Sequence, residues 1–551
     1  MASANIRMIQ AGAVPVIAKL CRIAKIREIV NQLVKWDEAI SRVSPGILIE
    51  SLIICILCGR KALWKVEQFW AKQDMTAVFQ GHLTLEQVND DAYGHALDKL
   101  AEISQETLVS LVGVTLLHAH AMGIRFIHFD TTSKSVQGAY EEEPTGDFDV
   151  NRGHSKDLRP DLKQFKIGAA VQENGLPIMG QLLSGNTADV TWNPEAAVEM
   201  QKFFTEKGYR DVIFVADCAL VSTEGLNKLA RQGVQFISRL PETFALAQTL
   251  KDEAWADGQW EDLGTLADSS EADRARYSVY STRRELAGRE YGFLVVHSSH
   301  LESRKEKTLQ RQFAKRKTAL EKEAAVLSDR PFACEDDARI ALEEWRADAR
   351  KQGFHVEGAV ERKTLHRHAH RGRPKKDALP DIEVTFHAQC VVGELKPEAW
   401  EQACRKESTF ILINDVRNPM SPAEILTEYK RQNTIEMKFR FLKSPVMLGP
   451  VYLKSKRRIE ALGYVFVLAL MLASYLEFRV RRELKQREEF LLLPGKKKTQ
   501  VPSITTILEY LNMITVVSIN GQRLLPDNVD KEALKMIRWA GFTEALYTEG
   551  L

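Results

Sequence analysis

The chain has 551 residues, of which 44% are hydrophobic and 27% are charged. This length allows three or more domains of about 100–200 residues each, and the composition is that of an ordinary soluble globular protein. The formal net charge is only +2, which excludes nucleic-acid binding through overall basicity, so any such surface must be a local patch. Seven irregularly spaced cysteines predict reduced, intracellular thiols and no disulfide framework.

Residues 1–120 are predicted to form a helical N-terminal region, because segments such as "DDAYGHALDKLAEI" repeat apolar residues at helical spacing. Its first residues lack the long apolar core of a signal peptide.

Residues 121–240 have a different pattern of apolar residues, typical of strands. Short runs rich in β-branched and aromatic residues, with helical patterns between the later ones, cover 124–130, 165–171, 178–185, 211–217 and 234–240. Three strands followed by alternating helices and strands predict a mixed α/β sheet.

The texture changes again over residues 241–405, where strand-like and highly charged helix-forming segments surround a basic loop. We interpret this stretch as an inserted domain. Residues 406–480 then supply a returning strand and a long helix that starts after the cap Ser421, with Pro422 at its first position and Lys443 at its end. Residues 481–551 form a helical tail.

The most apolar stretch, "ALGYVFVLALMLASYLEF" from Ala461, is near the lower limit of length for a membrane span. It contains Gly463 and Ser474 and lies between "KSKRR" and "RVRR". We expect a buried helix and no membrane association.

Two predicted strands end in an aspartate, Asp130 in "FIHFDTTS" and Asp217 in "VIFVADCA". One such acid is readily explained as a cap for the next turn. Two in one sheet favour a site, because ligands bind at the carboxyl ends of strands in open α/β sheets. Their oxygens suit Mg²⁺, and a third carboxylate would complete a two-metal site for phosphoryl transfer.

Several acids could be the third carboxylate. Asp189 lies near the end of the third strand, and Asp147 and Asp149 lie in an acidic loop. Glu436 differs because it is surrounded by bases that metal ligation would leave free for phosphates. The alternative is an ordinary surface pair between Glu436 and Arg440, four residues apart on a helix.

The ordered set Asp130, Asp217 and Glu436 resembles the DDE transposases of bacterial insertion sequences. Tyr429, position 432, Glu436 and Lys443 have the spacing of the Tyr-Arg-Glu-Lys signature of one branch. The segments "HFDTT", "GHSKDLRPDLKQFKIG", "SGNTAD", "VADCALVSTEGLNKLARQGVQFISRLP", "GPVYLKSKRRIEALGYVFVLAL" and "NDDAYGHALDKL" also look like blocks of that family. The resemblance covers most of the chain.

The resemblance implies an RNase H-like mixed-sheet core interrupted by an insertion domain, with helical N-terminal and C-terminal regions. It implies cut-and-paste transposition, in which the protein binds the inverted repeats, cleaves the DNA ends through a hairpin intermediate and joins them to target DNA. Asp130, Asp217 and Glu436 would hold two Mg²⁺ ions, with Mn²⁺ as a substitute. The working form would be a homodimer in a synaptic complex, with the tail as a dimerisation candidate. The location would be the bacterial cytoplasm, on the nucleoid when DNA is bound.

One residue departs from the signature, since Gln432 stands where the family has arginine. Tyr429 and Lys443 would grip phosphates beside the cut. Arg431 or Arg440 could replace the missing charge, because glutamine can donate to phosphate only without charge assistance. Either another residue replaces the arginine's phosphate contact, or this transposase is catalytically impaired.

Further DNA contacts are predicted from two basic segments. Residues 429–458 contain nine bases and Glu436 as the one acid, which favours phosphate contact. "RGRPKK", with Arg371 and Arg373, resembles a minor-groove AT-hook, although a solvated loop is an equal alternative. Metal binding by the alternating His366, His368 and His370 is not expected, because no cysteine or acid has zinc spacing beside them.

The family's insertion domain can supply a tryptophan that stacks on a flipped base. Trp255, Trp260 and Trp345 lie in this insertion, and we expect each to belong to the core.

Two alternatives to a transposase remain open on the sequence. One is an RNase H-like nuclease without strand transfer, which the long insertion and the Tyr429–Lys443 helix argue against. The other is a catalytically impaired copy that binds DNA and inhibits transposition, which only Gln432 supports.

Overall fold

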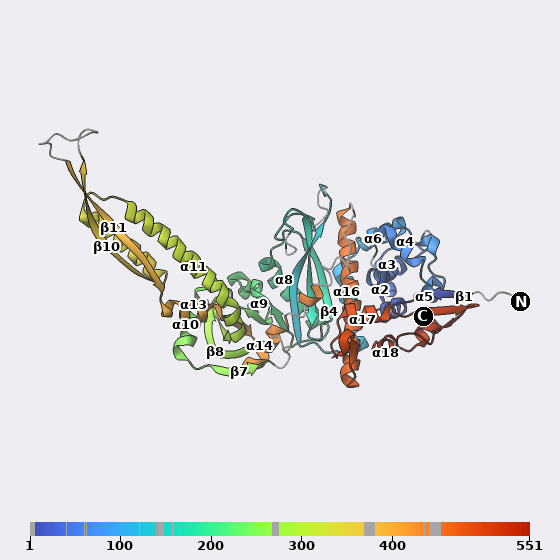
Figure 1. Ribbon diagram of the computed structural model, residues 1–551. Coiled ribbons are helices and arrows are strands. Elements are labelled where there is room, and N and C mark those ends of the chain that lie inside the picture. The colour runs from blue at the N-terminus through green and yellow to red at the C-terminus, as the bar shows by residue number, and fades with distance from the viewer. Residues whose placement is uncertain are drawn as a thin grey trace. The chain divides into compact units, whose positions relative to one another are not determined.

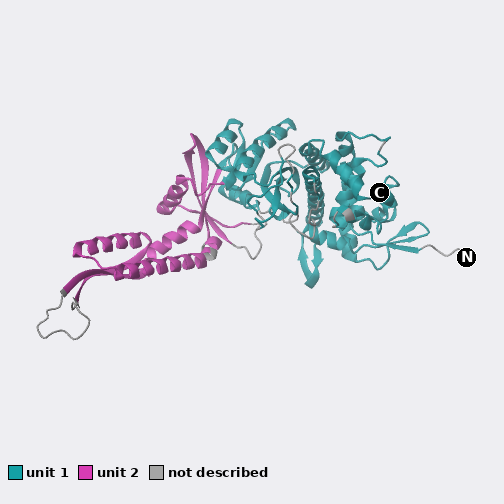
Figure 2. Ribbon diagram, turned by 90° about the horizontal axis from the view of Figure 1, so that it is seen from above, with its two compact units in different colours: residues 1–238, 414–551 teal, residues 239–413 magenta. Residues whose placement is uncertain are grey.

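The computed structural model describes most of the chain, and the protein folds into two compact units (Figure 2). Unit 1 comprises residues 1–238 and 414–551, and unit 2 comprises residues 239–413. The residues left out of the description are 1–5, 40, 60, 62, 121, 139, 142–147, 156–158, 267–274, 368–380, 433–435, 440–452 and 454, together with the side chains of 64, 302–304, 366–367 and 381.

Unit 1 is built on a mixed sheet with the strand order β4-β3-β2-β5-β6. The first three strands in the chain pair antiparallel, and β5 and β6 continue the sheet parallel to β2. The bounds are β2 Phe126–Val136, β3 Lys163–Gln172, β4 Pro177–Ser184, β5 Ile213–Ala216 and β6 Gln235–Arg239. Three antiparallel strands followed by parallel crossovers give the RNase H-like order, and the predicted fold class is confirmed.

Helices connect the parallel strands of this sheet and cover it. Helix α8 (Asp189–Glu206) joins β4 to β5, and α9 (Thr223–Arg231) joins β5 to β6. Ser222 caps α9 by accepting the Gly225 backbone N–H at 3.0 Å, which fixes where the chain re-enters helix after Asp217.

The apolar segment that includes residues 461–478 forms the core of α16 (Lys456–Gln486), which lies against β4 (Figure 1). This helix is long and apolar enough to cross a membrane, but 94% of its most apolar window is buried in the structure. Gly463 allows the close approach to the sheet, because a Cβ there would lie 2.2 Å from Leu182 Cδ2. The expected buried helix is therefore found.

The helical N-terminal region packs around α16 in unit 1. Ser51 Oγ and Tyr93 Oη are 2.7 Å apart in its core, where burial raises the pKa of the Tyr93 hydroxyl. Its helices are α1 Val14–Ile23, α2 Ile26–Leu33, α3 Pro45–Ile54, α4 Val66–Trp70, α5 Met75–Phe79, α6 Asp90–Leu100 and α7 Gln105–Ala119.

Substitution of Gly113 on α7 is expected to destabilise the fold strongly, because a Cβ there would lie 2.6 Å from the Ile178 carbonyl oxygen of β4. Backbone cannot yield as a side chain can, so we expect Gly113→Val to lower the free energy of unfolding by about 1–3 kcal/mol. Gly123→Val is the matched control, since nothing lies within 4 Å of its Cβ position, and it should change stability by less than about 0.5 kcal/mol. Urea denaturation followed by circular dichroism measures both, and equal effects would contradict the close contact.

The C-terminal region contains strands that the sequence did not predict. β15 (Val516–Ile519) pairs antiparallel with both β1 (Ile6–Ile9) and β16 (Gln522–Leu524). This sheet joins the two ends of the chain, so its strands depend on a partner about 500 residues away. The other elements of the tail are β13 Leu491–Leu493, β14 Lys497–Thr499, α17 Ile504–Leu511, α18 Lys531–Trp539 and α19 Ala545–Thr548.

Unit 2 combines a meander with a long hairpin flanked by two helices. β7 (Glu261–Thr265), β8 (Arg276–Leu286) and β9 (Arg289–Ser298) pair antiparallel, and β10 (Phe354–Arg367) pairs with β11 (Asp381–Leu395). Apolar residues of α11 (Ser299–Asp329) and α12 (Glu335–Lys351) pack on this hairpin. The remaining elements are α10 Ala245–Asp257, α13 Pro397–Glu407 and β12 Thr409–Asp415.

The helix expected to run from Pro422 to Lys443 is shorter in the structure. Ser421 and Glu424 form a capping box at the start of α14 (Pro422–Lys430). The helix ends at Lys430, where the Gln432 N–H turns to the Tyr429 carbonyl oxygen at 3.1 Å. Residues 436–439 are helical again. Apolar periodicity predicted one helix, but it does not detect a local change to tighter hydrogen bonds.

Candidate active site

Asp130 lies within β2, opposite Ala169 of β3. Its side chain is half-buried, and its Oδ1 accepts the Thr131 backbone N–H at 2.7 Å. The strand continues to Val136, so Asp130 is not at the strand end that the sequence predicts. It lies instead where β2 extends beyond its parallel neighbour β5.

Asp217 directly follows β5 and starts a short turn of 3₁₀ helix. Its Oδ1 accepts the Ala219 N–H at 3.0 Å and the Asn193 side-chain amide at 3.2 Å. Its carbonyl oxygen accepts the Ser238 hydroxyl at 2.7 Å. These bonds hold the half-buried carboxylate at the carboxyl end of the strand.

The two aspartates occupy matching positions on neighbouring parallel strands. His128 of β2 pairs with Val215 of β5, and the same register continued by two residues sets Asp130 beside Asp217. Because side chains at every second position share a face, both carboxylates belong to the same face of the sheet. Two hard carboxylate ligands at adjacent strands fit a divalent cation such as Mg²⁺.

Asp189, one of the candidates for the third carboxylate, is bound to other side chains of the core. Lys166 Nζ lies 3.0 Å from its Oδ1, and Thr131 Oγ1 donates to the same atom at 2.7 Å. The Lys166 side chain is only 5% exposed, so its ammonium group forms a buried ion pair with Asp189. The pair cross-links β3 to the start of α8 beside Asp130.

Glu436 is exposed in the short helical segment 436–439. Within the described part of the chain, no three histidine, cysteine, aspartate or glutamate side chains gather closely enough to hold a metal ion. The structure thus brings Asp130 and Asp217 to one place and does not bring Glu436 into a three-carboxylate cluster with them.

Three residues beside the aspartates form a buried network that the sequence did not predict. His128 Nε2 lies 2.7 Å from Glu428 Oε1, and His128 Nδ1 lies 3.1 Å from Gln432 Oε1. The Gln432 amide donates to the Phe129 carbonyl oxygen at 3.0 Å. A histidine inside the apolar run "FIHFD" was the available signal, because a buried polar group needs a partner.

Much of the basic charge counted in residues 429–458 is paired with acids from elsewhere in unit 1. Arg431 binds Glu428 at 3.0 Å. The other pairs are Lys438 with Glu477, Lys456 with Asp149 at 2.7 Å and Arg458 with Asp98 at 2.6 Å. Glu428 lies just before the counted segment, and spacing along the sequence did not show the three distant partners, so the local excess of charge is smaller than predicted.

The ion pair between Arg458 and Asp98 shifts the pKa of both groups. Hydrogen bonding to Arg458 lowers the pKa of the Asp98 carboxyl, and hydrogen bonding to Asp98 raises the pKa of the Arg458 guanidinium. The pair joins the start of α16 to α6. Arg458 therefore has a structural contact that its position in a basic segment did not indicate.

Four predicted DNA contacts lie outside the described residues, namely Arg440, Lys443, Arg371 and Arg373. The side chains of His366, His368 and His370 are outside them too. Tyr429 is half-buried on α14.

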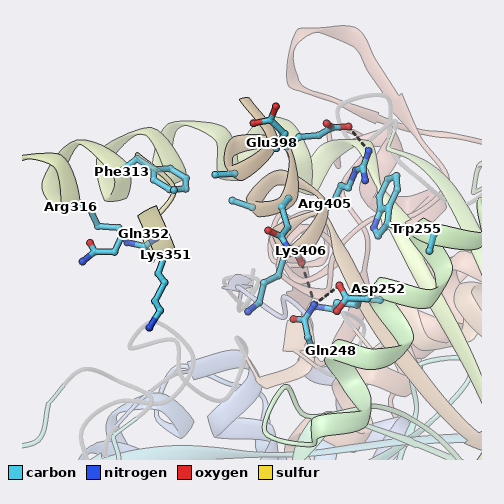
Figure 3. Close-up of a pocket in the computed structure, with 17 residues that line it drawn as sticks. Gln248, Asp252, Trp255, Phe313, Arg316, Lys351, Gln352, Glu398, Arg405 and Lys406 are labelled. Carbon is cyan, nitrogen blue, oxygen red and sulfur yellow. Dashed lines mark hydrogen bonds and ion pairs between the residues drawn. The ribbon is translucent and has the colours of Figure 1, made fainter. Parts of the chain in front are cut away.

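The tryptophans of unit 2 have different surroundings. Trp345 is 8% exposed and lies in the core between α12 and the hairpin. Trp255 lines an open pocket of about 870 Å³ (Figure 3), donates to Thr409 Oγ1 at 3.2 Å and has Arg405 5.1 Å from its ring centre. Trp260 packs against it with ring centres 5.0 Å apart. The pocket is also lined by Lys251, Arg316, Lys351 and Lys406.

Comparison with solved structures gives matches of low similarity. A piggyBac transposase synaptic complex with hairpin DNA matches at 10% identity, covering 90% of this chain and 79% of that one, with a TM-score of 0.37. A Mos1 transposase paired-end complex matches at 12% identity, covering 37% and 60%, with a TM-score of 0.15. At these scores neither match carries an argument. No curated protein matches.

Comparison with family models is decisive. Residues 5–113 match a domain of unknown function, DUF4277. Residues 129–472 match the transposase DDE domain. This second match covers more than half of the chain and starts one residue before Asp130, and the protein therefore belongs to the transposase DDE domain family.

Proposed function

We propose that this transposase binds the terminal inverted repeats of its insertion sequence, cleaves the DNA ends by metal-dependent phosphoryl transfer and joins them to target DNA. The observation that supports the proposal is the register of the parallel strands β2 and β5, which, continued by two residues, sets Asp130 beside Asp217, the residue after β5. Both aspartates lie inside the segment that matches the transposase DDE domain.

Asp130, Asp217 and Glu436 are the proposed catalytic carboxylates and the ligands of two Mg²⁺ ions, which Mn²⁺ could replace. Bound there, the metal ions would activate water or a 3′-hydroxyl and stabilise the leaving oxygen. The protein's own part is to hold Asp130 and Asp217 by backbone and amide hydrogen bonds, and to bring the exposed Glu436 to them.

The proposed partner is DNA, both the inverted repeats and the target. Tyr429 and Lys443 are proposed to contact phosphates beside the cut, with Arg431, Gln432 and Arg440 as further candidates. Arg371 and Arg373 are candidates for a minor-groove contact, and the N-terminal helices are candidates for reading the repeat. We further propose a homodimer that holds two ends together in the bacterial cytoplasm.

The test is incubation of the protein with Mg²⁺ and a linear DNA that ends in the element's inverted repeat, beside Asp130→Ala. Hairpinned ends and products joined to target DNA, absent in the variant, are the expected result. Nicking without joining would indicate a nuclease without strand transfer. A gel shift without cleavage, identical in the variant, would overturn both enzymatic functions and leave a DNA-binding inhibitor of transposition.

A further inference from the structure

We propose that Gln432 is a positioning residue. Two anchors, the bonds of Gln432 to strand β2 and of Lys438 to helix α16, restrict where Glu436 can lie relative to the aspartates. The inference rests on the proposed function, in which Glu436 is the third carboxylate. It gives position 432 the role of holding the polypeptide chain, in place of the phosphate contact for which Gln432 is a candidate above.

The first anchor joins the chain before Glu436 to the strand that carries Asp130. Gln432 bonds both the His128 side chain, at 3.1 Å, and the Phe129 backbone carbonyl, at 3.0 Å. His128 and Asp130 are two residues apart on β2, so their side chains share one face of the sheet. Gln432 is thereby held next to the first carboxylate.

The chemistry of this anchor suits an amide. The Phe129 carbonyl accepts, so the Gln432 amide nitrogen donates to it, and the Gln432 oxygen faces His128 Nδ1. Arginine has donors and no acceptor, so it would lack the oxygen that faces Nδ1. Glutamine at position 432, where the signature has arginine, thus bonds strand β2 in this chain.

The network also leaves His128 strongly oriented. Its Nε2 faces the Glu428 carboxylate at 2.7 Å, and the second Glu428 oxygen binds Arg431 at 3.0 Å. The side chains of His128 and Glu428 are 2% and 4% exposed. The imidazole is thus held by contacts at both ring nitrogens, and its Nδ1 faces Gln432.

The second anchor lies two residues after Glu436. Lys438 is 8% exposed and donates to Glu477 of α16, whose other oxygen accepts from Arg481 at 2.5 Å. Burial lowers the pKa of the Lys438 ammonium. Phe439, 4% exposed, adds an apolar contact at the same end.

Together the anchors restrict Glu436 strongly. Glu436 is four positions after Gln432 and two before Lys438, so its Cα lies within about 14 Å of the first and about 7 Å of the second even if the chain is extended. Glu436 itself is exposed while residues on both sides of it are held. This arrangement fixes the chain at one described residue before Glu436 and one after it, and a misplacement of 1 Å can slow catalysis by about 100-fold.

The test compares wild type, Gln432→Arg, Gln432→Met and Asp130→Asn on a DNA end at saturating protein. It measures the single-turnover cleavage rate and, separately, the Kd for the end. We expect both Gln432 variants to cleave about 10–100-fold more slowly, with a Kd within about threefold of wild type because no phosphate contact is lost. Gln232→Met, at an exposed glutamine on unit 1, is the matched control and should cleave normally.

The opposite result for Gln432→Arg would overturn the inference. If Gln432→Arg cleaves as fast as wild type or faster and binds the end more tightly at low salt, Gln432 stands in a phosphate site and the inference is wrong. If wild type does not cleave, or Asp130→Asn cleaves as well as wild type, the proposed function itself fails.

The second anchor needs a variant that keeps the fold. Lys438→Met alone leaves Glu477 buried without this partner and is expected to destabilise unit 1. The double variant Lys438→Met with Glu477→Met replaces the pair by apolar groups, which restores stability in other proteins. Arg481 loses Glu477 as well, but its side chain is 32% exposed and still donates to the Pro502 carbonyl oxygen at 3.0 Å. We expect its thermal unfolding to match wild type while cleavage stays at least about 10-fold slower. Recovery of the wild-type rate would show that Lys438 acts on stability only.

Discussion

Replacing Asp130 or Asp217 by asparagine is expected to slow cleavage of the DNA end by about 1,000-fold or more. Each aspartate would ligate metal, and the loss of one anionic ligand removes several kcal/mol of transition-state stabilisation, at about 1.4 kcal/mol for each factor of ten. Asparagine preserves size, and its oxygen can still accept the Ala219 N–H that Asp217 accepts at 3.0 Å. Single-turnover cleavage in Mg²⁺ measures the effect.

Asp211 offers the matched control for this prediction. It is an exposed residue just before β5, whereas Asp217 follows the same strand. Asp211→Asn should leave the rate within about twofold of wild type, because it removes the same charge far from the carboxyl end of the strand. Equal losses in Asp211→Asn and Asp217→Asn would point to an effect of overall charge on DNA binding and against metal ligation.

The second large effect is expected for Glu428→Ala, a change in stability of the fold. The Glu428 side chain is 4% exposed and lies 2.7 Å from His128 Nε2. Removing Glu428 leaves the buried His128 ring nitrogen without this hydrogen bond, which costs about 1–3 kcal/mol. We therefore expect the free energy of unfolding, from urea denaturation followed by circular dichroism, to fall by about that amount.

Glu424→Gln is the control on the same helix. Glu424 is exposed, and its carboxylate accepts the Ser421 N–H at 2.8 Å in the capping box. Glutamine serves equally at this position of a capping box, so the variant should be within about 0.5 kcal/mol of wild type. A small effect of Glu428→Ala would show that His128 and Arg431 find other partners, and it would weaken the argument for the first anchor.

The two predictions concern neighbouring parts of one strand. β2 carries Asp130 on one side of Phe129 and His128 on the other, so the proposed chemistry and the proposed positioning network share a short segment of backbone. A loss of activity in a His128 or Glu428 variant therefore needs the unfolding measurement beside it. The Gln432 variants are the cleaner probe, because Gln432 is only half-buried.

The sequence by itself determined the elements of the core and the family. Short apolar runs placed the strands β2 to β6 to within a few residues, except at the far end of β2, because the alternation of strand residues is a local property. It also identified Asp130 and Asp217 as a pair, because an acid beside a buried strand is costly unless it has a partner or a ligand. The Ser421 cap and the buried helix around Ala461 follow from equally local signals.

Only the tertiary structure decided which polar residues meet. His128 and Glu428 are 300 residues apart, and Arg458 and Asp98 are 360 apart. No periodicity encodes such contacts, because they depend on how helices pack on the sheet. The sequence counted Lys438 and Arg458 among the bases of a segment that favours phosphate contact, whereas the fold pairs them with the acids Glu477 and Asp98. It posed Gln432 as a missing arginine, whereas the fold gives its amide two hydrogen-bond partners on β2.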